Sequence, residues 1–457
     1  MFKRILIANR GEIALRIIRC CREMDIESVV VYSTADRRSL PVMTATHAVC
    51  IGPARASDSY LLQDSLIQTA LSMECDAIHP GYGFLSENAD FARKCEEHGI
   101  IFIGPSADII SRMGDKQQAR KLMMEHGIPV VPGTKELIHS ADEAAACAEE
   151  IGYPVLLKAS AGGGGKGMRR AYSREDIYAA YDTARAEAKA AFDNDDMYME
   201  KLIINPHHIE FQILADHSGH TIYLGERDCS IQKNNQKLLE ESPSNLLDDA
   251  LRREMGQVAV KAAKAAGYYS AGTIEFVVDD EKNYYFIEMN TRIQVEHPVT
   301  EAITGIDLIR EQIRIAAGMK LNIEQEDVRI EQHAIECRVN ALTPGVITFL
   351  HLPSGYGVRV DSHVFTGYEV SPYYDSMIAK VIVTGRTRLE AIRRLRRALE
   401  ELIIEGVKTN FDFMHLMTYH PSFIKGSYNT GFWEAHHETI ENWLEDGKAG
   451  AQRMTED

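Results

Sequence analysis

The sequence contains no long hydrophobic run. No stretch of its 457 residues approaches the roughly 18 apolar residues that a membrane helix needs. The apolar segment before Asn9 is also far shorter than the core of a signal peptide. With 45% hydrophobic and 26% charged residues, the composition is that of a globular protein. We therefore expect a cytoplasmic protein without a membrane partner.

Positive charge and paired cysteines are also scarce. Fifty Lys and Arg residues against 67 Asp and Glu residues give a net charge of −17, and a field of that sign repels polyanions. Nucleic acid is therefore not expected as a partner. The eight cysteines form no C-x-x-C pair and lie mostly in apolar or helical segments, so neither structural zinc nor disulfides are expected.

The length suggests about three domains, and the local patterns of the first 114 residues predict a parallel sheet. An apolar strand, a turn, an amphipathic helix and a second strand form a βαβ unit, and two further strands bracket another helix. The predicted strands are residues 4–8, 28–33, 76–80 and 100–104, and the predicted helices are residues 13–22 and 86–98. We predict a doubly wound, Rossmann-like domain over residues 1–114.

The next part of the chain, residues 115–330, predicts a sheet domain with a smaller lobe inserted into it. GIPVVPG at 127–133 contains two prolines and two glycines, which indicates a hinge. The lobe that follows, about 131–203, is expected to act as a mobile lid. Four strand-like segments beyond it alternate with one good helix at 249–266, which favours an antiparallel sheet with one helical layer.

The last third, residues 331–446, predicts a mixed domain, and a polar, frayed tail follows at 447–457. Apolar residues recur at helical spacing over 389–404, and we expect this stripe to be core. The whole chain is therefore predicted to combine α/β and α+β parts, with a Rossmann-like first domain, a central domain with a lid, and a mixed third domain.

The strongest glycine signal is the string KASAGGGGKGM at 158–168, which directly follows an apolar strand. Consecutive glycines allow backbone N–H groups to approach phosphate oxygens closely. A flexible surface loop is the alternative, but a lysine on the strand and another in the loop favour phosphate binding. The string matches neither G-x-x-x-x-G-K-[ST] nor G-x-G-x-x-G, so P-loop kinases and nicotinamide dehydrogenases lose their main support.

Acidic residues predict a metal site further along the chain. Glu288 and Asn290 lie two apart on a predicted strand and so project from one face. An antiparallel neighbour that carries Glu275 could add a third oxygen ligand, and such a set suits Mg²⁺ on nucleotide phosphates. A surface strand with ordinary alternation is the other reading, and the apolar neighbours of these residues weaken it.

A third group, Arg292, Gln294 and Glu296, follows this strand immediately. A guanidinium, an amide and a carboxylate in five residues could form a pocket for a small planar oxyanion with a base at its edge. Spacing alone leaves a structural ion pair between Arg292 and Glu296 equally possible.

Seven strings together resemble biotin carboxylase, an enzyme of the ATP-grasp class. They occur in the same order from residue 2 to about residue 440, and the string at 286–301 is the most specific of them. The strings are NRGEIALRI, HPGYGFLSENA, KASAGGGGKGM, ERDCSIQ, FIEMNTRIQVEHPVTE, ECRVNA and SPYYDSMIAK.

The resemblance implies a role for each matching residue. ATP phosphates would be bound by Lys116, Lys158, Gly164 and Gly165, adenine by Glu200, Lys201 and Ile203, and the ribose or phosphates by His208 and Gln232. The magnesium ligands would be Glu275, Glu288 and Asn290, with Mn²⁺ as a possible substitute. Bicarbonate would be bound by Lys237, Arg292, Gln294 and the Val295 backbone, with Glu296 as its base. Biotin would be bound by Arg338 and Tyr82.

Two departures from the family pattern stand out. Asn235 occupies a position where many relatives have histidine, and the segment LTPGVITF after Ala341 is shorter than the acidic loop expected there. The first affects one nucleotide contact, and the second affects the rim of the biotin pocket.

The function predicted from this resemblance is ATP- and bicarbonate-dependent carboxylation of biotin through carboxyphosphate. The chain carries no M-K-M biotinylation motif, so the biotin is expected on a separate carrier protein. The expected setting is a homodimeric component of a multi-subunit carboxylase, with a biotin carboxyl carrier protein and carboxyltransferase subunits as partners and acetyl-CoA carboxylase, in fatty acid biosynthesis, as the favoured parent enzyme. The alternatives are another bicarbonate-using ATP-grasp ligase and a non-catalytic nucleotide-binding regulatory subunit.

Overall fold

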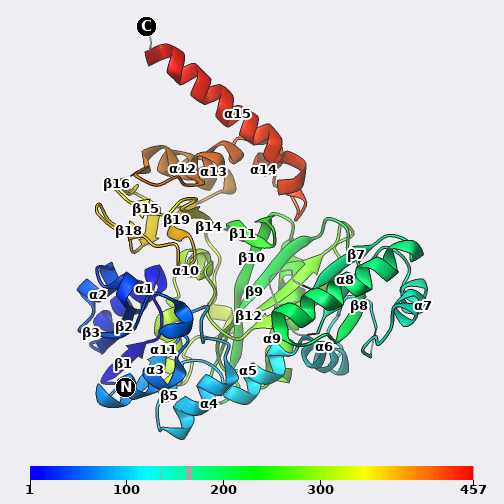
Figure 1. Ribbon diagram of the computed structural model, residues 1–457, viewed down its shortest axis with the longest axis horizontal. Helices are drawn as coiled ribbons and strands as arrows, with labels where there is room; N and C mark the ends of the chain where they lie inside the picture. The colour runs from blue at the N-terminus through cyan, green and yellow to red at the C-terminus, as the bar shows by residue number, and fades with distance from the viewer. Residues whose placement is uncertain (135, 161–166, 456–457) are drawn as a thin grey trace.

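The first part of the chain forms a parallel five-stranded sheet with helices around it (Figure 1). The structure, a computed structural model, describes residues 1–134, 136–160 and 167–455. The strand order is β3 (His47–Gly52), β2 (Glu27–Ser33), β1 (Arg4–Ile7), β4 (Ala77–His79) and β5 (Ile101–Phe102). The helices are α1 (Gly11–Glu23), α2 (Leu40–Thr44), α3 (Gln63–Ser72), α4 (Ala89–Glu97) and α5 (Ala107–Gly114), with short 3-10 turns at Thr34–Asp36 and Ala56–Asp58.

The strand order reverses at β1, which lies between β2 and β4. The loops that leave β1 and β4 therefore diverge at one edge of the sheet and open a crevice between them, the usual ligand position in such sheets. Asn9 and Arg10 lie on the first loop, Gly11 and Glu12 begin α1 directly after it, and Tyr82 lies on the second loop; all of them line the main cleft. The prediction of a doubly wound parallel sheet is confirmed.

A small lobe follows α6 (Lys116–Glu125). It contains an antiparallel sheet of β7 (Met168–Ala171), β6 (Val155–Ala159) and β8 (Met197–Lys201), covered by α7 (Ala141–Ile151) and α8 (Arg174–Phe192). The chain enters and leaves this lobe on two adjacent segments, which are hydrogen-bonded to each other. The bonds run from Lys201 N to Pro132 O (2.7 Å) and from Thr134 N to Met199 O (2.8 Å). Gly133 is required there, because a Cβ would lie 2.3 Å from the Met199 carbonyl oxygen.

The largest sheet has eight strands, and every neighbouring pair in it is antiparallel. It runs from the central part of the chain into the last third without interruption. Its order is β13 (Tyr284–Asn290), β12 (Ser270–Val278), β9 (His207–Ala215), β10 (Thr221–Lys233), β11 (Gln236–Ser242), β14 (His333–Asn340), β19 (Met377–Gly385) and β17 (Val358–Ser362). The predicted antiparallel arrangement is confirmed.

Helices cover both faces of this sheet, so the prediction of one helical layer is wrong. On one face α9 (Asp249–Ala265) packs on Phe211 and Phe276. On the other face α11 (Leu308–Ala316) packs on Leu214, and α10 (His297–Thr304) packs on Ala334. The sequence pattern did not reveal these two helices because they are short and bury polar side chains among their apolar ones.

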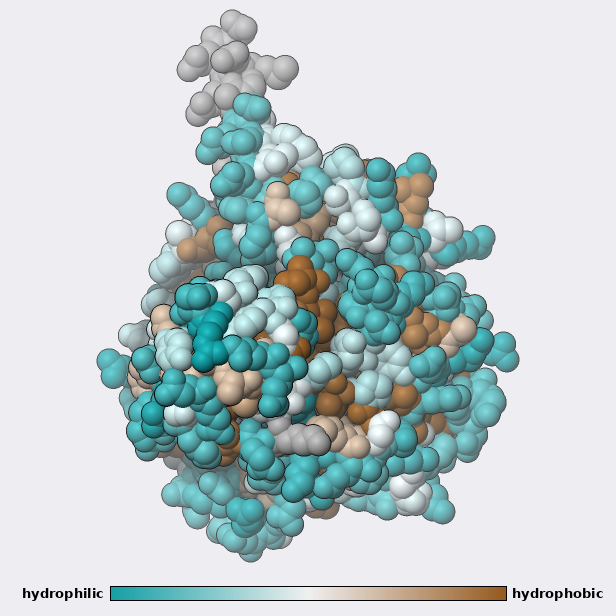
Figure 2. Space-filling model, turned by 90° about the vertical axis from the view of Figure 1, so that its right-hand side faces the viewer, coloured by the Kyte–Doolittle hydropathy of each residue, from teal (hydrophilic) through white to brown (hydrophobic). Residues whose placement is uncertain are grey.

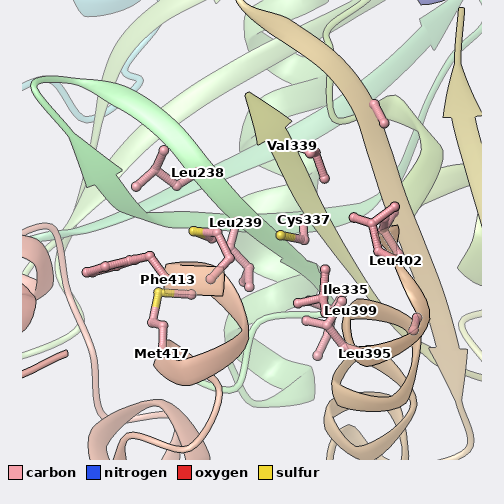
Figure 3. Packing of buried hydrophobic residues seen from close by; sticks show 14 of the residues in the cluster. Leu238, Leu239, Ile335, Cys337, Val339, Leu395, Leu399, Leu402, Phe413 and Met417 are labelled. Atoms are coloured by element: carbon pink, nitrogen blue, oxygen red, sulfur yellow. The ribbon is translucent and has the colours of Figure 1, made fainter. Parts of the chain in front are cut away.

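The last third packs a helical layer on the same sheet. Figure 3 shows Ile335, Cys337 and Val339 of β14 pointing toward Leu395 and Leu399 of α12. The remaining elements are α12 (Arg388–Glu401), α13 (Phe411–Met417), α14 (Pro421–Lys425), α15 (Phe432–Thr455), a 3-10 turn at Gln325–Asp327, and two strand pairs, β15 (Gly345–Val346) with β18 (Glu369–Val370) and β16 (Phe349–His351) with β20 (Ile403–Glu405).

Two predictions about this region need correction. The helix at 389–404 ends at Glu401, because Leu402 takes an extended conformation and Ile403 begins β20, where it is 43% exposed. The rest of the predicted stripe is core. The chain also stays helical to Thr455 where a frayed end was expected, and Lys448, Ala449, Ala451, Gln452 and Arg453 favour the helix there. Figure 1 shows α15 leaving the body of the molecule.

One face of the surface is mostly polar and the cysteines are unpaired. Figure 2 shows the face that carries the small lobe, which is mostly hydrophilic, with the hydrophobic residues in separate small areas. Within the described ranges, every helix falls short of the length and hydrophobicity needed to cross a bilayer. All eight cysteines are free, and six of them are buried.

Candidate active-site cleft

One cleft of about 1490 Å³ brings the predicted site residues together. Its walls come from the first parallel domain, the small lobe and the eight-stranded sheet. The predicted residues that line it are Tyr82, Lys116, Lys158, Glu200, Lys201, Ile203, His208, Gln232, Lys237, Glu275, Glu288, Asn290, Arg292, Gln294, Val295, Glu296 and Arg338. Gly164 and Gly165 were predicted as well but lie outside the described residues.

Two partly buried lysines mark the nucleotide end of the cleft. Lys158 Nζ lies 2.6 Å from Glu200 Oε2, and Lys116 Nζ lies 3.2 Å from Glu288 Oε2. Burial alone would lower the pKa of Lys158, but Glu200 raises it above its ordinary value. Both ammonium groups therefore stay charged and could bind phosphate oxygens.

Residues 199–203, with the sequence MEKLI, lie where the lobe joins the body. Lys201 uses its ammonium group to bind the Gly152 and Tyr153 carbonyl oxygens at 2.8 and 2.7 Å, so this group is already hydrogen-bonded within the lobe. Ile203 lines the cleft next to it. The segment therefore presents backbone and apolar surface to the cleft, as a flat ring would require.

His208 and Gln232 lie side by side between the lysines and the acidic residues. Gln232 Nε2 is 3.0 Å from His208 Nδ1, and His208 Nε2 is 2.8 Å from Glu275 Oε2. Burial alone would lower the pKa of His208, but Glu275 raises it above its ordinary value. The predicted pair thus lies together and in contact with one predicted metal ligand.

The predicted metal ligands are adjacent in the sheet. Glu275 of β12 is directly opposite Glu288 of β13, and Asn290 Nδ2 donates to Glu275 Oε1 at 2.7 Å. Glu288 is half-buried and faces Lys116. Two carboxylates and an amide oxygen are the hard donors that Mg²⁺ prefers, so these residues fit the ion. In the described part of the chain, His208, Glu210 and Glu275 also have potential ligand atoms within 4.8 Å of one another.

Glu296 lies between two cations. Lys237 Nζ is 2.6 Å from Glu296 Oε1, and Arg338 Nη2 is 2.9 Å from Glu296 Oε2. Burial alone would raise the pKa of Glu296, but Lys237, Arg338 and Arg227 lower it well below its ordinary value. Glu296 is therefore ionised and ready to accept a proton.

Lys237 is also bonded to Glu210 at 2.6 Å and to Glu275 at 3.1 Å. Burial would lower its pKa, but these three carboxylates raise it well above its ordinary value. A permanent positive charge thus lies between the predicted base and a predicted metal ligand, where an incoming anion would bind it.

Arg292 donates to Glu87 Oε2 at 2.8 Å and to Asn290 Oδ1 at 2.9 Å. It therefore pairs with Glu87, and the ion pair with Glu296 that spacing left open is not formed. Gln294 donates to Glu275 Oε1 at 2.7 Å. The Val295 carbonyl accepts a hydrogen bond from Lys380 at 2.7 Å, which fixes the backbone beside Glu296.

A fully buried arginine, Arg227, holds the side chains that contact Lys237 and Glu275. It is 0% exposed and bonds the side chains of Glu210, Gln212, Thr273, Gln294 and Thr300. Because it contacts both Glu210 and Gln294, it orients two side chains that in turn hold Lys237 and Glu275. A guanidinium has five donors in fixed directions, which suits this supporting role.

Arg338 and Tyr82 also line the cleft. Arg338 Nε donates to Glu240 Oε1 at 2.6 Å, in addition to its contact with Glu296. The Tyr82 hydroxyl bonds Glu12 Oε1, and Glu12 is 3.0 Å from Lys380. Arg338 thus bonds the carboxylate oxygen of Glu296 that Lys237 does not bond.

Local backbone structure explains how the chain accommodates the two departures from the family pattern. Asn234 and Asn235 form the two-residue turn between β10 and β11 with φ of 51° and 61°, a conformation that asparagine tolerates well. The short segment after Asn340 is held by hydrogen bonds from Ala341 N to Ser376 O and from Leu342 N to Lys408 O. Asn340 and Ser376 both line the cleft.

Several residues at the site were missed by sequence reasoning. Glu87, Arg227, Glu336 and Lys380 lie within the strings that carry the family resemblance, so their position there was an available signal. Glu210 and Glu240 lie in strands with ordinary alternation, and only the sheet register places them beside Lys237 and Arg338.

The fold and the site together define the class. A small antiparallel lobe and a large antiparallel sheet enclose a cleft with partly buried lysines at one end and paired acidic residues beside them, which is the arrangement of an ATP-grasp ligase. The comparisons agree. Three family models cover most of the chain: "Biotin carboxylase, N-terminal domain" at 1–110, "Carbamoyl-phosphate synthase L chain, ATP binding domain" at 115–324, and "Biotin carboxylase C-terminal domain" at 328–435.

Curated relatives match over nearly the full length. Biotin carboxylase 1 of Bacillus subtilis is 55% identical over 95% of this chain and 99% of its own, and biotin carboxylase of Nostoc sp. is 53% identical over 94% and 98%. The chain belongs to the biotin carboxylase family, a family of ATP-dependent ligases.

Solved structures give the same result. The biotin carboxylase domain of Hydrogenobacter thermophilus 2-oxoglutarate carboxylase, a dimer in complex with MgADP, ADP and bicarbonate, matches with a TM-score of 0.93 and 48% identity, over 96% of this chain and 99% of its own. Biotin carboxylase of Campylobacter jejuni in a complex described as β-γ-ATP matches with a TM-score of 0.93 and 48% identity, over 95% and 99%.

Proposed function

We propose that the cleft carboxylates biotin with ATP and bicarbonate, in the first half-reaction of a multi-subunit carboxylase. The observation that carries the proposal is the position of Glu296. It bonds both Lys237, which also contacts the predicted metal ligand Glu275, and Arg338, which also contacts Glu240. The base Glu296 thus contacts Lys237, where an anion could bind, and also Arg338, a second cation. A reaction with one step at each cation requires this arrangement.

The first step makes carboxyphosphate. Lys237 and Arg292 hold the bicarbonate anion, Gln294 and the Val295 backbone orient it, and Glu296 removes its proton. The resulting oxygen nucleophile attacks the γ-phosphate of ATP and displaces ADP. Lys116 and Lys158 bind the phosphate oxygens, and Mg²⁺ on Glu275, Glu288 and Asn290 would neutralise charge on the transferred group.

The second step uses Arg338. Carboxyphosphate breaks into CO₂ and phosphate, and the phosphate takes the N1′ proton of biotin. The ureido oxygen becomes negative, and the permanent charge of Arg338 stabilises it while N1′ attacks CO₂. Tyr82 lines the pocket on the other side. Closure of the lobe at 131–203 over the nucleotide would keep water away from the intermediate.

The proposed partners, oligomeric state, location and parent enzyme follow from membership of the biotin carboxylase family. They are a biotin carboxyl carrier protein as substrate, carboxyltransferase subunits that use the product, a homodimer, a cytoplasmic location, and acetyl-CoA carboxylase as the parent enzyme. The Hydrogenobacter relative is described as a dimer, and a relative from Methanothermobacter thermautotrophicus, 49% identical, is named for its place in a pyruvate carboxylase. The final acceptor is therefore a property of the carboxyltransferase.

The test of this function is ATP cleavage with and without bicarbonate, each with and without free biotin. We expect cleavage to require bicarbonate and to rise when biotin is added. Cleavage that requires ammonia and ignores biotin would instead indicate a carbamoyl-phosphate type of ligase.

Metal dependence gives a separate prediction. Glu288→Gln is expected to lower ATP cleavage at least about 100-fold, since even outer-shell partners of a metal are worth 10–100-fold. The fold should remain intact because Glu288 is half-buried and pairs only with Lys116 among the described residues. Cleavage is measured against Mg²⁺ concentration, with Mn²⁺ in parallel. Full activity of the variant, or of the wild type in excess chelator, contradicts the metal assignment.

A further inference from the structure

Two fully buried glutamates lie behind Arg338 and take no part in the proposed steps. Glu240 of β11 and Glu336 of β14 are directly opposite in the antiparallel register, and both are 0% exposed. Directly opposed residues project from one face, with Cβ atoms about 4.5–5.5 Å apart. The two carboxyl groups therefore share one small space inside the protein.

Figure 3 shows which face this is. Leu239, Ile335, Cys337 and Val339 point toward the helices of the last third. Because side chains alternate along a strand, Glu240, Glu336 and Arg338 project from the opposite face, toward α10 and the cleft. Ala334, two residues before Glu336, packs on α10 and confirms this orientation.

The hydrogen bonds of the pair are incomplete. Arg338 Nε donates to Glu240 Oε1 at 2.6 Å. Among the described residues, Glu240 Oε2 and both carboxyl oxygens of Glu336 have no hydrogen-bond partner. Two ionised carboxylates side by side, with only one of their four oxygens hydrogen-bonded, would be strongly unfavourable. One proton between them would remove a charge and supply the missing donor.

The surrounding charges agree with this reading. The groups that face the pair are Lys237 on β11, Arg338 on β14, Lys380 on β19, Glu12 on α1, Tyr82 after β4 and Glu296 before α10. The ammonium group of Lys380 bonds Glu12 at 3.0 Å and the Val295 carbonyl at 2.7 Å, and it makes no hydrogen bond to either carboxyl oxygen of Glu336. Burial raises the pKa of Glu240 to about 7 and that of Glu336 well above its ordinary value.

We propose that Glu240 and Glu336 hold one proton between them and act as a positioning pair for Arg338. Glu240 fixes the guanidinium group, and the shared proton limits the charge that faces it to one negative unit. When the proton is lost, the second negative charge competes with the ureido oxygen for Arg338. This inference rests on the proposed function, because it concerns the residue assigned to biotin.

The first test compares two rates over pH 6 to 9.5: carboxybiotin formation, and bicarbonate-dependent ATP cleavage without biotin. In the wild type, the ratio of the first to the second should fall as pH rises, because loss of the proton affects only the biotin step. Glu336→Gln should lack this fall, since an amide cannot ionise. A variant whose ratio falls with pH as the wild type's does overturns the inference.

The second test uses thermal unfolding and needs no activity. The pair holds more protons in the folded than in the unfolded protein, so the contribution of this pair to stability should fall as pH rises above about 4.3. Glu336→Gln removes one of the two groups that must lose a proton as pH rises. Its Tm should therefore equal or exceed that of the wild type, and the difference between the two Tm values should grow with pH. Infrared difference spectra of the two proteins should show a protonated carboxyl band only in the wild type.

Glu241→Gln is the matched control. Glu241 is the next residue on β11 and equally buried, but His333 and Arg388 bond it at 2.6 and 2.8 Å and lower its pKa to about 2. Its replacement leaves a cation unpaired, so Tm should drop, and failure to fold is the extreme of that result.

The two tests separate the failures. If Glu336→Gln lowers Tm as Glu241→Gln does, or if the carboxyl band is absent from the wild type, Glu336 is an ionised partner of Lys380 and the inference is wrong. If the wild type makes no carboxybiotin, the proposed function fails, and the unfolding and infrared tests still decide whether the pair shares a proton.

Discussion

Glu296→Gln should abolish bicarbonate-dependent ATP cleavage. Glutamine has nearly the same size but cannot take a proton from bicarbonate, so the first step has no base. Loss of a positioned general base typically costs about 10²–10⁴ in rate. ATP should still bind, because Glu296 lies beside Lys237 and Arg338 and not beside the lysines of the nucleotide end. Phosphate release with and without bicarbonate is the measurement.

The controls decide whether the effect is chemical. Lys237 keeps Glu210 and Glu275 as partners in the variant, so the fold should persist. Glu434→Gln changes an exposed carboxylate at the rim of the same cleft and should leave the rate unchanged. Arg292→Ala should weaken the same step through loss of bicarbonate binding. Bicarbonate-dependent cleavage by Glu296→Gln at the wild-type rate contradicts its role as base.

Arg338→Gln should lose carboxybiotin formation while keeping most bicarbonate-dependent ATP cleavage. Its charge is needed only when the ureido oxygen becomes negative, and removal of one such contact typically costs about 10²–10³ in rate. Released carboxyphosphate would then decompose without transfer, so phosphate should form in excess over carboxybiotin. Both products are measured in the same reaction.

Arg338→Lys refines this prediction. Lysine keeps the charge but lacks the planar fork that contacts Glu240 and Glu296 together. Its carboxybiotin yield should fall between those of the wild type and Arg338→Gln. If Arg338→Gln carboxylates biotin at the wild-type rate, or if both variants lose ATP cleavage first, Arg338 does not serve the second step.

Local patterns were sufficient to predict the fold class. Alternation and turn residues located β1, β2, β12 and β13, and the apolar period located α12. The prediction of one helical layer failed because α10 and α11 bury Thr300 and Glu311 among their apolar residues, which obscures the helical stripe. The end of α12 was misplaced because Leu402 and Ile403 continue the apolar period into an extended segment.

The candidate site was predictable only in part. Glu288 and Asn290 are near in sequence, so their common face followed from strand geometry, and Glu275 required one assumed strand pairing that the register bears out. The partner of Arg292 could not be predicted by spacing, because Glu87 comes from the first domain, 205 residues away. The same holds for Glu240 and Glu336, whose contact depends on the pairing of β11 with β14, two strands that lie far apart in the sequence.

Transfer of labelled carbon from bicarbonate to biotin is the most direct test of the central claim. Purified chain is mixed with MgATP, labelled bicarbonate and free biotin, and labelled carboxybiotin is counted against phosphate released. The account predicts label in biotin that requires ATP, Mg²⁺ and bicarbonate together and disappears in both Glu296→Gln and Arg338→Gln. Phosphate release without any label in biotin, under conditions where both variants still fold, would contradict it.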